Sequence, residues 1–283
     1  MFGYRSDGVK LKNIPPFFKV IPLLMKTRND SQVYYSEDLP ISSLDEYIAE
    51  KASEGIKITY MHIFYAALVR MMAIRPRLNR FVINGRTYSR NGIFISLAIK
   101  KGLTDEGDET TLKIEFDGSE NIFQVKEKLE NEILINKDKL ASNNTDGLAK
   151  TLSHIPHFIM EFTVNFLIFL DKHGMLPKSI IALSPFHTSA FLTNVGSIGI
   201  DAIYHHLYNF GTTSLFLAMG KKKKSFVYGD DSIKEEKCIS IALVGDERIC
   251  DGFYFASSIK SFKKYIKNPK LLEENISRLE DNI

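Results

Sequence analysis

Two short polar segments carry residue types that could do chemistry together. Residues 193–197 (Thr-Asn-Val-Gly-Ser) follow an apolar run, and the hydroxyl of Thr193 could donate a hydrogen bond to a developing oxyanion. Residues 246–252 (Asp-Glu-Arg-Ile-Cys-Asp-Gly) contain Glu247, whose carboxylate could accept a proton as a general base. A base and an oxyanion donor are groups that could act together in one catalytic site. On spacing alone, residues 193 and 194 could also simply end a strand, with the glycines forming the turn.

Both segments resemble motifs of one known superfamily. Residues 246–253 resemble the His-x-x-x-Asp-Gly element of the chloramphenicol acetyltransferases, including their Cys-Asp-Gly-Phe run. Residues 193–199 resemble the Ser-Asn-x-Gly-x-x-Gly region of the dihydrolipoyl acyltransferases of 2-oxoacid dehydrogenase complexes. The similarity begins near Pro22 and passes through Pro76, Asn79 and Gly220. It implies one catalytic domain over residues 1–283, without a lipoyl or subunit-binding domain, and a chloramphenicol acetyltransferase-like α/β fold of two layers.

The resemblance also implies a role for each candidate residue. Glu247 stands where these families have the catalytic histidine, and Thr193 falls on the serine that faces the oxyanion. Asp251 matches an aspartate that orients the loop through an ion pair, and its partner is expected to be an arginine such as Arg5 or Arg28. The expected substrate contacts are Asn194, Ser197, Arg248 and His206.

Glutamate in place of histidine changes the expected mechanism. An ordinary glutamate has a pKa of about 4.3 and an ordinary histidine about 6.5, so the driving force for proton transfer falls by roughly 3 kcal/mol. Burial can raise a carboxyl pKa and restore part of that loss. Two hypotheses follow. The chain is either a coenzyme-A-dependent acyltransferase that uses Glu247 as its base, or an inactive homologue that binds thioesters or serves in assembly.

The resemblance implies a homotrimer with its sites between subunits. The Glu247 loop of one chain would meet the Thr193 segment of its neighbour. Coenzyme A or acyl-coenzyme A is expected as a substrate rather than as a covalently bound cofactor. The acceptor is not specified, because a lipoyl group would have to come from another protein. His205 and His206 point in different directions on any regular element, so at most one of them would reach a site.

The composition of the chain argues against several other classes of function. Thirty-seven Lys and Arg against 34 Asp and Glu give a net charge of +3, far below that of a dedicated nucleic-acid binder. The basic run at residues 221–224 is therefore predicted to be a solvated turn. The two cysteines suggest neither a disulfide framework nor a metal site, and Cys250 is expected in the core. With no basic n-region and apolar h-region at the start, a cytoplasmic location is expected, without nucleic-acid or membrane partners.

The order of expected elements favours one α/β domain with a mixed sheet. Thr59 is predicted to cap a helix over residues 60–74 that Pro76 ends. Residues 81–88 give a hairpin signal around an Asn-Gly pair. Residues 158–170 are strongly apolar but too short to span a membrane, which predicts a buried helix. A last helix is predicted after Gly252.

Overall fold

A six-stranded mixed sheet forms the centre of the computed structural model, which describes residues 5–100, 109–141, 155–228 and 232–281. In spatial order its strands are β2 (Gln32–Pro40), β9 (Ile233–Asp246), β8 (Leu215–Tyr228), β7 (Ala190–Asn194), β5 (Ile93–Lys100) and β6 (Glu109–Phe116). β7 runs parallel to both of its neighbours, and the other pairs are antiparallel. The predicted mixed sheet is confirmed.

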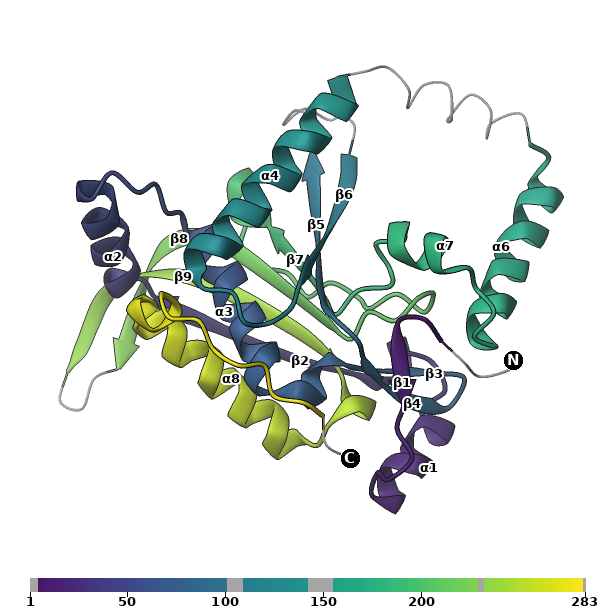
Figure 1. The fold of residues 1–283 in the computed structure, drawn as a ribbon. Coiled ribbons are helices and arrows are strands. Elements are labelled where there is room, and N and C mark those ends of the chain that lie inside the picture. The colour runs from purple at the N-terminus through teal and green to yellow at the C-terminus, as the bar shows by residue number, and fades with distance from the viewer. Residues whose placement is uncertain (1–4, 101–108, 142–154, 229–231, 282–283) are drawn as a thin grey trace.

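Helices cover one face of this sheet (Figure 1). They are α2 (Ser42–Ser53), α3 (Tyr60–Ile74), α4 (Ile122–Ala141) and α8 (Gly252–Lys267). The apolar side chains of α3 and of the strands form one large buried cluster with residues of α8. Short 3-10 helices occupy Asn29–Ser31, Pro76–Asn79, Val195–Ile198, Glu247–Ile249 and Pro269–Leu272. The two-layer α/β architecture is therefore as the sequence predicted.

The central helix α3 shows why the local sequence folds as it does. The hydroxyl of Thr59 accepts a hydrogen bond from the backbone N–H of His62, and the His62 ring accepts one from the Thr59 N–H. This reciprocal cap satisfies two N–H groups that have no partner inside the helix. Pro76 follows the last turn and cannot continue the helix. The predicted bounds of this helix are confirmed.

A small antiparallel sheet lies at one end of the large one. Its strands are β1 (Gly8–Lys10), β4 (Arg86–Arg90) and β3 (Arg80–Ile83), in that order. The turn between β3 and β4 is the predicted hairpin, with φ of 48° at Asn84 and 66° at Gly85. Helix α1 (Pro16–Leu24) packs on this turn, since a Cβ at Gly85 would approach the Leu23 side chain to 2.8 Å.

Two predictions are wrong: the burial of one helix and the turn at the basic run, whose lysines are nevertheless largely exposed as predicted. The apolar helix α6 (His157–Lys172) is not buried: of its residues only Asp171 is, and the helix projects from the body together with α7 (Lys178–Leu183) (Figure 1). The basic run at residues 221–224 is not a turn, because β8 continues through it to Tyr228. Pairing with β9 resumes there after a bulge, and Lys223 forms an ion pair with Asp38. In the described part of the chain, no helix is both long and apolar enough to cross a membrane.

Candidate active site

The Glu247 loop is held by the buried carboxylate of Asp246. β9 ends at this residue, and the chain then makes the 3-10 turn Glu247–Ile249 before α8 begins. Asp246 accepts hydrogen bonds from Nε and a terminal nitrogen of Arg248, at 2.8 and 2.7 Å, and from the Arg248 backbone N–H at 3.1 Å. The hydroxyl of Ser31 donates a further bond at 3.0 Å. Four bonds to one carboxylate fix the loop from its first residue.

Arg28 approaches the same carboxylate from a third side. Its Nε lies 3.6 Å from an Asp246 oxygen, and its terminal nitrogens donate to the backbone carbonyls of Tyr208 and Val82 at 2.6 and 3.0 Å. Burial lowers the pKa of Arg28 to about 10, although the Asp246 charge opposes this change. The predicted ion pair with an N-terminal arginine therefore exists, but on a different aspartate.

Asp251 does not have the partner that the resemblance implied. Its carboxylate caps α8 by accepting a hydrogen bond from the backbone N–H of Tyr254 at 2.7 Å. Its nearest cation is Arg77, 3.7 Å away, and both side chains are partly exposed. Arg5 instead binds Asp7 and Asp171, deep in the small-sheet end. Asp251 thus pairs with an arginine, but with Arg77 rather than Arg5 or Arg28, and the buried pairs of the loop are made by Asp246.

Glu247 and Arg248 face opposite sides of the loop. Arg248 is 3% exposed and donates to Asp246 and to the Met25 carbonyl, so its role is structural. Glu247 is exposed and lines a pocket of about 380 Å³ between β2 and α8. Its carboxylate forms no hydrogen bond or ion pair with any described residue, which leaves it open to a ligand. The pocket is lined by Val33, Tyr34, Tyr35, Asp246, Glu247, Cys250, Gly252, Phe255, Ala256, Ile259, Lys260 and Lys263.

Cys250 borders this pocket, but its thiol is not activated as a nucleophile. The side chain is 3% exposed, as the sequence predicted for a core residue. Burial raises the pKa of its thiol to about 12, and the Asp251 charge acts in the same direction.

The Thr193 segment forms the end of β7 and a tight crossing over β8. The 3-10 turn Val195–Ile198 passes so close to β8 that a Cβ at Gly196 would lie 2.3 Å from the Gly220 carbonyl oxygen. Gly220 is just as constrained, with the Ser240 hydroxyl 2.1 Å from where its Cβ would be. Close backbone packing therefore explains why both positions are glycine, since any side chain there would clash. Thr193 is half-buried, and its hydroxyl makes no hydrogen bond to the described residues.

Other polar residues near Thr193 in the sequence already contact neighbouring groups. The hydroxyl of Ser197 donates to the Asn194 carbonyl at 2.7 Å, although the Ser197 residue is exposed. His206 is exposed beside the ring of Tyr208, whereas His205 stacks on Phe216 with 4.1 Å between ring centres. Neither histidine lines the Glu247 pocket.

A single chain does not bring Thr193 and Glu247 together. Asn194 pairs with Met219, and Met219 pairs with Ile241, five residues before Asp246 on β9. At about 3.4 Å per residue, the two segments are separated by roughly 17 Å along the sheet. Thr193 lies level with Ala242 in the sheet and Glu247 lies beyond the end of β9, so the two side chains are not in contact within the described chain.

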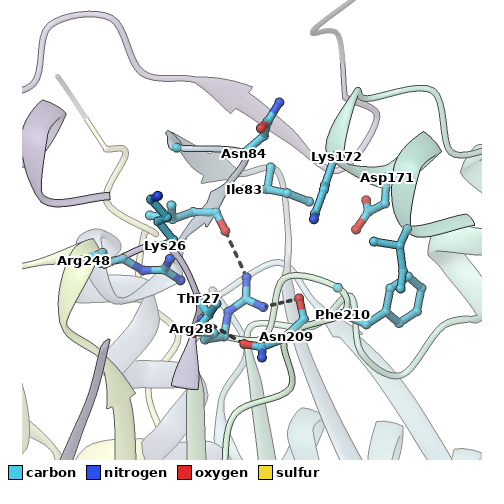
Figure 2. A pocket seen from close by; sticks show the side chains of 14 residues that line it. Lys26, Thr27, Arg28, Ile83, Asn84, Asp171, Lys172, Asn209, Phe210 and Arg248 are labelled. Atoms are coloured by element: carbon cyan, nitrogen blue, oxygen red, sulfur yellow. Dashed lines mark hydrogen bonds between the residues drawn. The ribbon is translucent and has the colours of Figure 1, made fainter. Parts of the chain in front are cut away.

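A second pocket lies on the Arg248 side of the loop (Figure 2). Its volume is about 320 Å³, and it opens between α6, the β3–β4 turn and the residues after α1. Lys26, Lys172, Arg28 and Arg248 contribute positive charge, and Asp171 is the acid in its lining. Sequence reasoning missed this pocket because its residues come from segments far apart in the chain and match no motif.

Comparison with known proteins agrees with this architecture. Residues 186–273, which include both polar segments, match the family model of the 2-oxoacid dehydrogenases acyltransferase (catalytic domain). A comparison with the curated proteins finds no match. Among solved structures, a probable dihydrolipoamide acetyltransferase from Listeria monocytogenes is similar at 17% identity and a TM-score of 0.57, over 96% of this chain and 99% of that one.

Two further structures extend the comparison. The cubic core of the pyruvate dehydrogenase multienzyme complex is similar at 14% identity and a TM-score of 0.59, over 93% of this chain and 94% of that one. A chloramphenicol acetyltransferase is similar at 12% identity and a TM-score of 0.53, over 92% and 100%. The chain has the chloramphenicol acetyltransferase-like fold. The resemblance that the motifs predicted is confirmed, and the Glu247 and Thr193 segments both lie inside the matched region.

Proposed function

We propose that the protein transfers an acyl group from a coenzyme A thioester to a small acceptor, in a site formed by two subunits of a homotrimer. One subunit contributes Glu247 and its pocket, and the neighbour contributes Thr193. The observation that carries this proposal is the separation of two functional groups that have no hydrogen-bond partner among the described residues. Both lie in the region that matches the acyltransferase family model, yet the strand register separates them by roughly 17 Å along the sheet.

Each group has a defined chemical task. The Glu247 carboxylate takes the proton from the acceptor as the acceptor attacks the thioester carbonyl. The hydroxyl of the neighbour's Thr193 donates a hydrogen bond to the oxyanion of the tetrahedral intermediate. The carbon–sulfur bond then breaks, and coenzyme A leaves as a thiol after it takes up a proton. Asn194 and Ser197 follow Thr193 in the same segment, and in this proposal they contact the substrate together with His206.

The Glu247 pocket suits an acylated thiol carrier. Its lining is largely apolar, with Phe255 and Ile259 inside, and its two lysines are on α8. Lys260 is exposed and could bind a phosphate of coenzyme A, whereas Lys263 already pairs with Glu37. The buried bonds of Asp246 hold Glu247 in this pocket through the backbone of the loop.

The decisive experiment follows thiol release from acetyl-coenzyme A in the presence of candidate hydroxyl, amine and thiol acceptors. Wild-type protein should release free thiol only with an acceptor, and Glu247→Gln should abolish release while calorimetry still shows coenzyme A binding. The exposed Glu46→Gln, far from both segments, is the control and should behave as wild type. Unchanged turnover in Glu247→Gln would remove that residue from the mechanism.

A second candidate function follows from the same residue. Glu247 occupies the position of the base in the families that the chain resembles, and a carboxylate is an intrinsically weaker base than imidazole. A homologue that binds thioesters without turning them over would show calorimetric binding of acetyl-coenzyme A and no thiol release with any acceptor. Robust release by the wild type would eliminate this candidate.

A further inference from the structure

Helix α1 presents an apolar stripe to solvent. Phe17, Val20, Leu23 and Leu24 are exposed by 67, 50, 60 and 71%. Helical spacing puts these four side chains on one face, and Leu23, at one edge of that face, also contacts the β3–β4 turn at Gly85. Four of the nine residues of α1 are large, apolar and exposed, and they form a continuous patch rather than isolated surface residues.

Helix α6 exposes a second, larger apolar surface. Four phenylalanines follow one face at intervals of four, four and three residues, and each is about half exposed or more: Phe158 71%, Phe162 71%, Phe166 50% and Phe169 49%. Ile159, Met160 and Val164 are exposed on other sides. The helix contacts the body only near its C-terminal end, where Asp171 is buried against Arg5 and His187.

The same end of the molecule is locally basic, although the whole chain is nearly balanced. No acidic residue lies between Asp7 and Asp30 in the sequence. The exposed cations around α1 are Lys10, Lys12, Lys19, Lys26 and Arg86. None of them takes part in the ion pairs that the described residues form. Lys10, Lys12, Lys19 and Arg86 also line one shared surface depression beside α1.

The cationic pocket of Figure 2 lies between the two apolar helices. Lys26 follows α1, and Lys172 is the last residue of α6. The acid of the pocket, Asp171, is already neutralised by Arg5 at 2.8 Å, and that arginine and His187 lower its pKa against the effect of burial. Arg28 is 3% exposed, and its Nε has no hydrogen-bond partner among the described groups. Arg28 and Arg248 share the single negative charge of Asp246, and Lys26 and Lys172 form no ion pair among the described residues, so the pocket has a net positive charge.

We propose that α1 and α6 dock on an anionic lipid bilayer, with a lipid phosphate in the pocket between them. Apolar helices flanked by unpaired cations are the composition that binds the interface of a negatively charged membrane, where apolar side chains enter the acyl boundary and lysines meet phosphates. In Figure 1 the two helices lie on either side of the small sheet, and residues that follow α1 and residues of α6 line the same pocket. This inference departs from the sequence expectation of no membrane partner.

The charge pattern favours a bilayer over a second copy of the chain. A symmetric contact through this end would bring the five α1-side cations of one copy toward those of another, and like charges repel. An anionic lipid surface has the complementary charge. Because neither helix is long enough to cross the bilayer, the contact is interfacial.

Vesicle flotation with the purified full chain tests the proposal independently of any acyl transfer. We expect binding to vesicles of phosphatidylcholine with phosphatidylglycerol, little binding to phosphatidylcholine alone, and weaker binding as salt is raised. The triple variant Lys12→Gln, Lys19→Gln and Lys26→Gln should bind roughly a hundredfold more weakly, from about a factor of five per lysine. Phe17→Ser with Leu24→Ser, and separately Phe162→Ser, should also reduce binding.

Matched controls use the opposite end of the sheet. Lys221→Gln with Lys234→Gln removes two exposed lysines, and Phe226→Ser removes a phenylalanine that is 70% exposed. Both should bind as wild type does. Absence of binding to anionic vesicles, or equal losses in the controls, would overturn the proposal. If the α1 and α6 variants instead lower the oligomeric state of a chain that does not bind vesicles, the surface is a subunit contact and the membrane assignment is wrong.

Discussion

Replacing Asp246 by Asn should loosen the Glu247 loop and destabilise the whole domain. The carboxylate accepts four hydrogen bonds and neutralises Arg248 and Arg28, and all three side chains are 3% exposed or less. The amide keeps the shape and one acceptor, but it leaves two guanidinium groups buried without a counter-charge. Breaking one side of a buried pair costs about 3–5 kcal/mol, and the retained acceptor favours the lower end, about 3 kcal/mol.

Thermal and urea unfolding at fixed protein concentration measure this change. With an unfolding entropy of about 2.1 cal/mol/K per residue, a loss of about 3 kcal/mol lowers the melting temperature of a 283-residue chain by about 5 °C. Asp251→Asn is the matched control, because Asn caps a helix as well as Asp does and should cost less than about 0.5 kcal/mol. The reasoning is refuted if the Asp246 variant loses under about 1 kcal/mol, or if the Asp251 variant loses as much.

Three further outcomes are expected. Thr193→Val should reduce acyl transfer by about a hundredfold or more by removing the oxyanion donor, with coenzyme A binding retained, while Thr193→Ser keeps the hydroxyl and most of the rate; equal rates for Val and Ser would exclude the hydroxyl. Lys113 has its pKa lowered to about 8, mainly by burial and then by the Arg90 charge, so the unfolded chain holds its proton up to higher pH than the folded one. Stability of the wild type relative to Lys113→Met should therefore rise between about pH 8 and pH 10, and a flat or falling difference in urea midpoints would contradict this. Cys238 and Cys250 are both buried and their thiol pKa values are raised by burial, so neither should react with a thiol reagent at pH 8 until the protein unfolds; fast labelling of the native protein would show that the region around one of them opens.

The sequence predicts most reliably what local chemistry determines. Thr59 and Pro76 bound α3 because a cap and a missing N–H act within one turn. The Asn-Gly pair predicts the hairpin because few other residues adopt its positive φ. The two candidate segments were found through their resemblance to family motifs, which are short and contiguous in the sequence.

Long-range packing decided what the sequence could not show. Apolar content predicted a buried helix at residues 158–170, but burial depends on whether another element covers the helix, and α6 contacts the body at one end only. Four consecutive lysines suggested a turn, yet the ladder with β9 carries β8 through them. The loop-orienting aspartate was assigned to position 251 by motif, whereas the choice between Asp246 and Asp251 depends on which carboxylate faces Arg28.

Mixing two inactive variants tests the central claim most directly. Subunits with Glu247→Gln and subunits with Thr193→Val are unfolded together in equal amounts, refolded, and assayed for acceptor-dependent thiol release from acetyl-coenzyme A. If each site takes its base from one subunit and its oxyanion donor from the neighbour, random assembly gives an intact site about one time in four, and about a quarter of wild-type activity returns. Mixtures as inactive as the separate variants, beside an active wild type refolded in the same way, would contradict a site shared between chains.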